Sequence, residues 1–243
     1  MTDIKKLKDI IMSSDNVVFF GGAGVSTGSG IRDFRGENGL YKQQDENIKY
    51  YLSSYCFYNE PSKFFRNYKD HMNFLSYEPN IIHKCLSLLE KKGRIKTIVT
   101  QNIDGLHQKA GSIKVCEIHG TIHNNHCIMC GRRYDSKKVF EGEDIPRCKC
   151  GGLIKPDVVL FGEPLTCEFQ HAKIAIKKAD TLIVAGTSLV VQPACNLIKL
   201  FNGKNLIIIN DNPTPYDVFA TMNIRDDLVD VFSHLYREII KEK

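Results

Sequence analysis

Four of the nine cysteines lie close together in the chain, in a pattern typical of a metal site. Cys127 and Cys130 are separated by two residues; after a gap of seventeen, Cys148 and Cys150 are separated by one. Tetrahedral zinc takes two such pairs of thiolates, and a glycine follows each pair as a turn residue. The second pair is one residue shorter than usual, and a histidine, at 123 or 126, could replace a cysteine. Because four sulfurs leave no position for water, we expect a structural zinc ion.

A glycine-rich loop follows the apolar run 17–20, and it could cradle a phosphate. Gly22, Ala23 and Gly24 carry little or no side chain, so backbone N–H groups could approach a pyrophosphate. The spacing differs from that of the dinucleotide-binding dehydrogenases, because Thr27 occupies the position of their third glycine. Nor is an acidic residue placed about 20 residues further on to hold a ribose. By itself, the loop is equally an ordinary turn from a strand to a helix.

The elements that must position these residues follow from the spacing of apolar side chains. Short apolar runs predict buried strands at residues 17–20, 95–99, 158–161, 181–185 and 206–209. Amphipathic spacing predicts helices at residues 4–11, 61–75, 79–92, 168–178, 193–201 and 228–240. The alternation of strands and helices is typical of an α/β fold, a Rossmann-like parallel sheet with helices on both faces.

Two stretches interrupt this alternation and predict inserted parts. Residues 121–154 contain the cysteine pairs and little periodic apolar sequence, so we expect a small zinc-binding module there. Residues 36–79 begin with a polar, irregular stretch and continue with a helix, which predicts a flexible cofactor loop and a helical insert. Residues 1–35, 80–120 and 155–243 remain for a discontinuous Rossmann-like domain.

Composition and charge narrow the class of protein. The chain has 243 residues, of which 42% are hydrophobic and 25% charged, as in a typical globular protein. Its net charge of +5 is too small to indicate nucleic acid. No apolar run approaches the roughly 18 residues of a membrane helix, and the N-terminus lacks the apolar region of a secretory signal. An odd number of cysteines with one tight cluster is typical of a reducing compartment, so we expect a cytoplasmic protein. From the charge and the apolar runs we expect neither membrane nor nucleic-acid partners.

Several longer motifs resemble those of the bacterial-type sirtuins, which are NAD-dependent protein lysine deacylases. They are GAGVSTGSGIRDFRG at 22–36, TQNIDGLHQKAG at 100–111, EIHGT at 117–121, KPDVVLFGE at 155–163 and GTSLVVQPA at 186–194. Together with the cysteine pairs they occur in the family's order over nearly the whole chain. The resemblance explains the unusual glycine spacing, since sirtuins consume NAD as a substrate and do not use it as a hydride carrier. It also implies that the Rossmann-like domain binds NAD.

The resemblance implies removal of an acetyl, or a longer apolar acyl, group from protein lysines, giving nicotinamide, O-acyl-ADP-ribose and free lysine. His119, after a short strand at 115–118, matches the histidine that activates a ribose hydroxyl as general base. An imidazole with an unperturbed pKa of about 6.5 suits this task. Asn102 and Asp104 match catalytic positions in the nicotinamide pocket, where Asp104 can accept a hydrogen bond from the carboxamide. From the residues alone, a single histidine is more often structural than catalytic. Asn102 and Asp104 could equally form an Asx-rich turn between a strand and a helix.

Further contacts with both substrates are implied by the same resemblance. Phe34 would shield the reacting centre from water, and Arg35 would face a phosphate. The other implied NAD contacts are Gly22, Ala23, Gly24, Thr27, Gln101, Ile103, Gly186, Thr187, Ser188, Asn210 and Asp227. The acyl-lysine peptide would add a strand between residues 158–163 and 189–192. Its implied contacts are Val158, Val159, Phe161, Gly162, Glu163 and Val190.

The sequence also bears on the acyl group and on rival functions. Sirtuins that remove succinyl carry a tyrosine and an arginine in the helix before the Glu-Pro-Asn found here at 78–80. This chain has Phe65 and Tyr68 there and no arginine to pair with a carboxylate, so we expect acetyl or a longer apolar chain.

Mono-ADP-ribosyl transfer, which cleaves NAD but uses another acceptor, is one alternative to deacylation. A non-enzymatic NAD or ADP-ribose sensor with a nucleic-acid-binding zinc module is the other.

Overall fold

The apolar run that begins at Val17 forms β1 (Val17–Gly21), the strand on which the larger part of the molecule is built. The structure is a computed structural model that describes residues 2–33, 39 and 47–241. In it β1 lies inside a six-stranded sheet of order β3-β2-β1-β7-β8-β9, in which every pairing is parallel. The other strands are β2 (Ile95–Thr100), β3 (Val115–Glu117), β7 (Thr181–Ala185), β8 (Asn205–Ile209) and β9 (Met222–Ile224). The predicted α/β class is confirmed.

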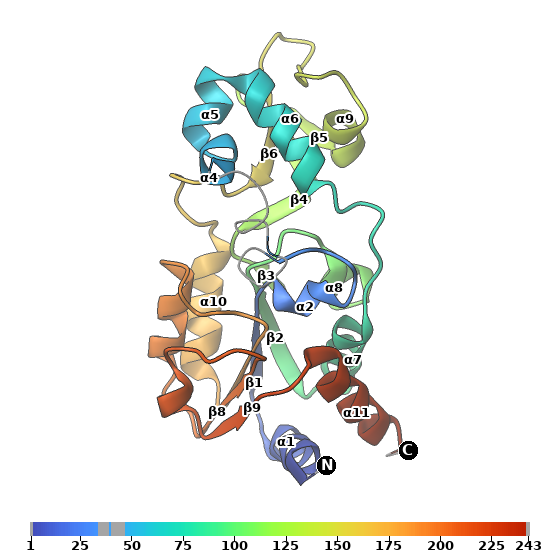
Figure 1. Cartoon of the computed structure of the whole chain (residues 1–243), viewed down its shortest axis with the longest axis vertical. Coiled ribbons are helices and arrows are strands. Elements are labelled where there is room, and N and C mark those ends of the chain that lie inside the picture. The colour runs from blue at the N-terminus through green and yellow to red at the C-terminus, as the bar shows by residue number, and fades with distance from the viewer. Residues whose placement is uncertain (1, 34–38, 40–46, 242–243) are drawn as a thin grey trace.

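Helices cover both faces of this sheet, which explains why its strands are apolar without alternation. Along β1, Val17 and Phe19 pack into one core, and Val18 and Phe20 pack into another. Figure 1 shows α7 and α11 on one side of the sheet and α10 on the other. The helices on the first side are α1 (Thr2–Ser13), α7 (Ile81–Lys91) and α11 (Leu228–Lys241). Those on the second side are α10 (Glu168–Lys178) and the 3₁₀ helix η1 (Ala194–Leu200). We call this part the large lobe.

A second, antiparallel sheet of order β5-β4-β6 belongs to a small lobe, drawn above the large one in Figure 1. Its strands are β4 (Gly120–Cys127), β5 (Arg133–Asp135) and β6 (Ile154–Val158). Its helices are α4 (Ile48–Tyr51), α5 (Ser54–Asn59), α6 (Pro61–Met72) and α9 (Ser136–Phe140). Aromatic side chains of α5 and α6, such as Phe57 and Phe64, share one core with Ile122 and Cys127 of β4. The helical insert and the cysteine-containing segment therefore pack as a single unit.

Some predicted elements differ from the observed ones. The expected strand at 158–161 is wrong: the chain pairs at 154–158, in the antiparallel sheet and not in the parallel one. A four-residue apolar run cannot by itself distinguish a strand from a buried irregular segment. The helix expected at 61–75 ends at Met72, and the one at 193–201 is a 3₁₀ helix. Short helices also occur at α2 (Gly24–Thr27), α8 (Leu106–Lys109) and η2 (Asp217–Phe219).

Among the described helices, none combines the length and the apolar character that crossing a membrane would require. The longest is α11, which buries one face against α7 and α1 and ends in charged residues. Its apolar stripe is therefore used within the large lobe.

Candidate active site and zinc site

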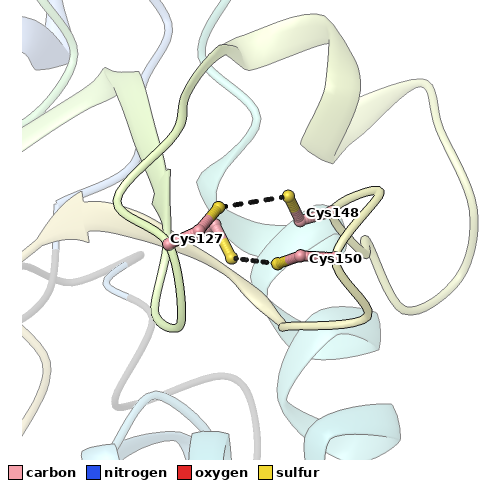
Figure 2. A group of neighbouring side chains, drawn as sticks. Cys127, Cys148 and Cys150 are labelled. Atoms are coloured by element: carbon pink, nitrogen blue, oxygen red, sulfur yellow. Dashed lines mark hydrogen bonds between the residues drawn. The ribbon is translucent and has the colours of Figure 1, made fainter.

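The four clustered cysteines converge in the small lobe, as Figure 2 shows for Cys127, Cys148 and Cys150. All four sulfurs lie within 4.8 Å of one another; Cys127 Sγ is 3.4 Å from Cys150 Sγ, and Cys130 Sγ is 3.6 Å from Cys148 Sγ. A tetrahedral zinc ion with Zn–S distances of about 2.3 Å places its sulfurs about 3.8 Å apart. The thiol set therefore fits a structural zinc ion.

The two histidines that could have replaced a cysteine are used elsewhere. His123 Nε2 lies 3.0 Å from the main-chain oxygen of Asp104, and His126 Nδ1 lies 2.5 Å from Asp157 Oδ1. The structure thus selects the four-cysteine set from the alternatives that the sequence left open.

The shortened second pair of ligands closes through the backbone of the residues that follow it. The N–H of Cys148 donates to the carbonyl of Gly152, and the N–H of Gly151 donates to the carbonyl of Cys148, both at 2.9 Å. A Cβ on Gly152 would stand 2.7 Å from Cys127 Sγ. Glycine at 152 therefore allows the loop to approach the first pair closely enough for four thiolates to share one ion.

The glycine-rich loop lies where β1 ends, against the chain that leaves β7. Gly22 N–H donates to the Ala185 carbonyl at 3.2 Å, and Gly24 N–H donates to the Gly186 carbonyl at 2.9 Å. A Cβ on Gly24 would lie 2.8 Å from Gly186 Cα. The sequence had suggested that backbone N–H groups of this loop could approach a phosphate, but in the structure these two N–H groups are used inside the protein. The glycines are needed because two backbones approach each other here.

Asn102 and Asp104 follow β2, and both are hydrogen-bonded to the buried hydroxyl of Ser26 in the glycine motif. Asn102 Nδ2 donates to the Gly22 carbonyl at 3.1 Å and to Ser26 Oγ at 3.0 Å. Ser26 Oγ in turn donates to Asp104 Oδ2 at 2.7 Å, and Leu106 N–H donates to Asp104 Oδ1 at 2.9 Å. Burial raises the pKa of the Asp104 carboxyl, and these two donors oppose the increase. The arrangement holds a carboxylate and an amide in fixed orientation at the carboxyl end of β2.

Ser26 was missed by the sequence analysis, although it lies inside the glycine motif. Its side chain is 1% exposed and joins two residues that are 76 and 78 positions away in the chain. A hydroxyl between a carboxylate and an amide is satisfied as donor and acceptor at once. Its position in the motif was the available signal; its partners depend on the parallel pairing of β1 with β2.

His119 follows β3 and is oriented by the main chain of the neighbouring strand. Its Nδ1 lies 2.8 Å from the carbonyl oxygen of Gln101. A carbonyl only accepts, so Nδ1 carries the proton, and Nε2 of the neutral ring is left as a base. Gln101 is itself held by Thr187, whose Oγ1 accepts from Gln101 Nε2 at 3.1 Å. Burial lowers the pKa of His119 from its ordinary value of 6.5, and the Gln101 carbonyl partly offsets this.

Two other histidines pack against each other, away from solvent. His83 and His107 are at most 1% exposed, with ring centroids 4.8 Å apart, and burial lowers the pKa of both. His83 Nδ1 accepts the N–H of Asn80 at the start of α7. They are structural, as a lone histidine usually is. Beside His119, burial raises the pKa of Glu117 to about 7.

The segment expected to bind peptide links the two lobes. Val159 N–H donates to the His119 carbonyl at 2.9 Å, and Phe161 N–H donates to the Leu52 carbonyl at 3.1 Å. Phe161 is 43% exposed, and Val190, in the other segment expected to bind peptide, is 49% exposed. Val158 is buried in the small-lobe core. Each segment thus presents an exposed apolar side chain.

These features agree with comparisons to known proteins. A family model described as the Sir2 family matches residues 22–193. The chain belongs to the Sir2 family. It is 50% identical over 232 residues to an NAD-dependent protein deacetylase of Clostridium acetobutylicum, covering 93% of this chain and 94% of the relative. It is also 45% identical to one of Clostridium tetani, covering 97% of this chain and 98% of the relative.

Solved Sir2 structures have the same fold. One contains a deacetylated p53 peptide and 3′-O-acetyl-ADP-ribose; it is 38% identical, with a TM-score of 0.90, and the match covers 97% of this chain and 98% of that chain. Another contains a p53 peptide and NAD; it is 37% identical, with a TM-score of 0.87 over 98% of this chain and 99% of that chain. Sir2 membership thus extends over both lobes.

The remaining predicted Sir2 site residues include two that the structure does not describe and two that follow β8 or precede α11. Phe34 and Arg35 lie outside the described residues. Asn210, at the end of β8, donates from Nδ2 to the Asn212 carbonyl at 2.8 Å and is 8% exposed. Asp227 precedes α11 and accepts the N–H of Asp230 on Oδ1 at 3.0 Å, which is the geometry of a helix N-cap. Its predicted place near the adenine stays a prediction.

The other predicted NAD contacts gather at the carboxyl ends of β1, β2 and β7. They are Gly22, Ala23, Gly24, Thr27, Gln101, Ile103, Gly186, Thr187 and Ser188. β1 lies between β2 and β7 in the sheet, so the chain connections reverse direction there. Ligands of doubly wound sheets bind at such a switch point. The polar set of Asn102, Asp104 and Thr187 at that place therefore fits a dinucleotide.

We predict that Gly24→Ala weakens NAD binding by about tenfold or more, since the new methyl group would push apart two backbones at the switch point. The same strain should destabilise the fold by about 1–3 kcal/mol. Titration calorimetry with NAD and thermal unfolding measure the two effects. Gly93→Ala is the matched control: Gly93 has φ +73° with nothing within 4 Å of its Cβ, so only stability should fall. Equal NAD affinity in the two variants would contradict the prediction.

Proposed function

We propose that the protein is an NAD-dependent protein lysine deacetylase that transfers the acetyl group to ADP-ribose. The observation that carries this proposal is the hydrogen bond from His119 Nδ1 to the Gln101 carbonyl, which leaves Nε2 as a proton acceptor at the switch point. Relatives named NAD-dependent protein deacetylase support it, as do Sir2 structures with an acetylated peptide and with acetyl-ADP-ribose.

Each part of the site has a distinct task in this proposal. NAD supplies the ADP-ribose that accepts the acyl group and releases nicotinamide. Asp104, held by Ser26 and Leu106, binds and orients the carboxamide, and Asn102 orients the neighbouring ribose or a water molecule. His119 accepts a hydroxyl proton at Nε2. Neutral imidazole is the form that burial favours, so the base is ready at neutral pH.

The substrate is proposed to be a protein or peptide containing acetyl-lysine or a longer apolar acyl-lysine. Val158, Val159, Phe161, Gly162, Glu163 and Val190 are the proposed contacts. Four of the N–H groups in residues 158–163 are already used: they donate to the His119, Leu52 and Leu160 carbonyls and to the Glu163 carboxylate, so peptide pairing must use the others. Phe65 and Tyr68 are buried in the small-lobe core and offer no cation for a succinyl carboxylate. This supports an apolar acyl group.

The zinc ion is proposed to be structural, held by Cys127, Cys130, Cys148 and Cys150. We also propose that residues 1–35, 80–120 and 155–243 bind NAD and that residues 121–154 bind zinc. We also propose a cytoplasmic location, since nine cysteines with one tight cluster favour a metal site in a reducing compartment over a disulfide framework.

The proposal is tested by mass spectrometry of the protein with NAD and an acetyl-lysine peptide. Loss of acetyl from the peptide, with O-acetyl-ADP-ribose and nicotinamide appearing together, is the expected result. Nicotinamide release with the peptide still acetylated would favour ADP-ribosyl transfer. Binding of NAD without any turnover would favour a sensor.

The pH dependence of turnover is predicted to follow His119. The base must be neutral, and its pKa is lowered from 6.5, so kcat/KM should stay high as the pH falls to 6.5 and decrease only below it. Steady-state rates between about pH 5 and 8 provide the profile. An acid limb with its midpoint above 6.5 would assign the titration to another group.

A further inference from the structure

The side chain of Glu163, expected at the peptide site, is joined to a buried lysine. Lys155, on β6, is 9% exposed, and its Nζ lies 3.0 Å from Glu163 Oε2. The two side chains are 11% and 20% exposed. A charged group with so little water around it is stabilised only by a partner and by hydrogen bonds.

Hydrogen bonds from this pair reach the main chain on both sides of the peptide segment. Lys155 Nζ donates to the Val158 carbonyl at 3.2 Å, at the point where β6 ends. Glu163 Oε2 accepts the N–H of Leu160 at 3.0 Å, and Glu163 N–H donates to the Leu160 carbonyl at 2.9 Å. The ion pair thus closes residues 158–163 into one turn with fixed ends.

The same turn is attached to the catalytic base and to the helical part of the small lobe. Val159 N–H donates to the His119 carbonyl. On its far side Phe161 pairs with the chain at Leu52 and Ser54, through an N–H donated to Leu52 and a carbonyl that accepts from Ser54. A displacement of the turn would therefore move the edge that faces the peptide relative to His119.

We propose that Lys155 and Glu163 form a positioning pair that sets the peptide-binding segment at the right distance from His119. In this role the Glu163 carboxylate acts through the turn, so the contact that Glu163 makes with the peptide is proposed to involve its main chain and not its side chain. The inference deepens the proposed deacetylase function and rests on it. It predicts that loss of either charge weakens peptide binding alone, because NAD is held at the switch point of the large lobe.

The variants Lys155→Met and Glu163→Gln remove one charge each with little change in size, and Lys155→Arg restores the cation. Lys63→Met is the control, since Lys63 pairs with Glu60 at the surface of the same lobe. For each variant, KM is measured for an acetyl-lysine peptide and for NAD, together with the unfolding temperature. The Kd of the same peptide, labelled with fluorescein, is measured without NAD.

We expect KM and Kd for the peptide to rise by about tenfold in Lys155→Met and in Glu163→Gln, with KM for NAD within about twofold of wild type. Lys155→Arg should be close to wild type, and Lys63→Met should change neither. Equal increases in KM for the peptide and for NAD would overturn the proposal. An increase in the peptide Kd for Glu163→Gln without one for Lys155→Met would also overturn it, because it would indicate direct contact between the Glu163 side chain and the peptide.

The same measurements also distinguish a variant that does not fold and a failure of the deacetylase proposal itself. If Lys155→Met does not fold, Glu163→Gln and Lys155→Arg decide the question, because the first keeps an acceptor for the Leu160 N–H and the second keeps the charge. If the wild type binds the labelled peptide but does not consume NAD, the deacetylase proposal fails. The positioning pair is then judged on the Kd values.

Discussion

Replacing His119 by alanine is expected to lower deacetylation of an acetyl-lysine peptide by about 10²–10⁴-fold, the usual contribution of a positioned general base. The Nδ1 hydrogen bond to Gln101 fixes the ring, so that Nε2 alone can take the proton. Alanine removes both the base and the contact. Because Gln101 is also held by Thr187, the surrounding loop should keep its place. NAD affinity should therefore change by no more than a few-fold.

Deacetylation rates and NAD binding are measured on the same preparations. His171→Ala is the matched control, since this histidine lies on α10 with a side chain that is 63% exposed. It should retain full activity. If His119→Ala deacetylated at close to the wild-type rate, another group would have to be the base, and the proposed mechanism would be wrong. A loss of NAD affinity as large as the loss of rate would instead assign His119 to binding.

Removal of the zinc ion is expected to unfold the small lobe and abolish activity. Cys127 and Cys148 belong to the same core as Phe57, Phe64 and Tyr68 of the helical insert. Structural zinc sites contribute on the order of 10 kcal/mol in small zinc-binding peptides, as much as the whole stability of a typical domain. Loss of the ion should therefore spread through this core to β4, which follows His119, and to the peptide segment after β6.

Cys148→Ser and treatment of the wild type with a chelator test this expectation. Metal analysis should give one zinc ion per chain before treatment, and circular dichroism should show partial loss of structure afterwards. NAD binding should persist in part, because the large lobe has two cores of its own. Cys167→Ser is the control, since Cys167 is exposed and outside the cluster. Retention of both structure and activity without metal would show that the thiols alone support the lobe.

Local features of the chain were sufficient to predict the larger part of the fold. The runs at 17–20, 181–185 and 206–209 are apolar because their strands are buried on both faces, and this burial is visible in the residues themselves. The cysteine pairs likewise define a zinc site by spacing alone. Short strands such as β5 and β9, with three residues each, carry too little pattern to be predicted. His119 was singled out only by its motif, because an imidazole in a sequence has no visible partner.

The tertiary structure decided which residues far apart in the chain come into contact. Ser26 reaches Asp104 across 78 positions, and His119 reaches the main chain of Gln101, because parallel pairing brings the ends of β1, β2 and β3 to one edge. The common core of the small lobe joins two segments that the sequence presents as separate inserts. Apolar periodicity and ligand spacing are local properties, so sequence alone determined most of the buried strands and the place of the zinc site, and the structure then selected the four cysteines over the two nearby histidines. Hydrogen-bond partners depend on the order in which strands assemble, so only the folded chain could show which donor and acceptor orient each reactive group.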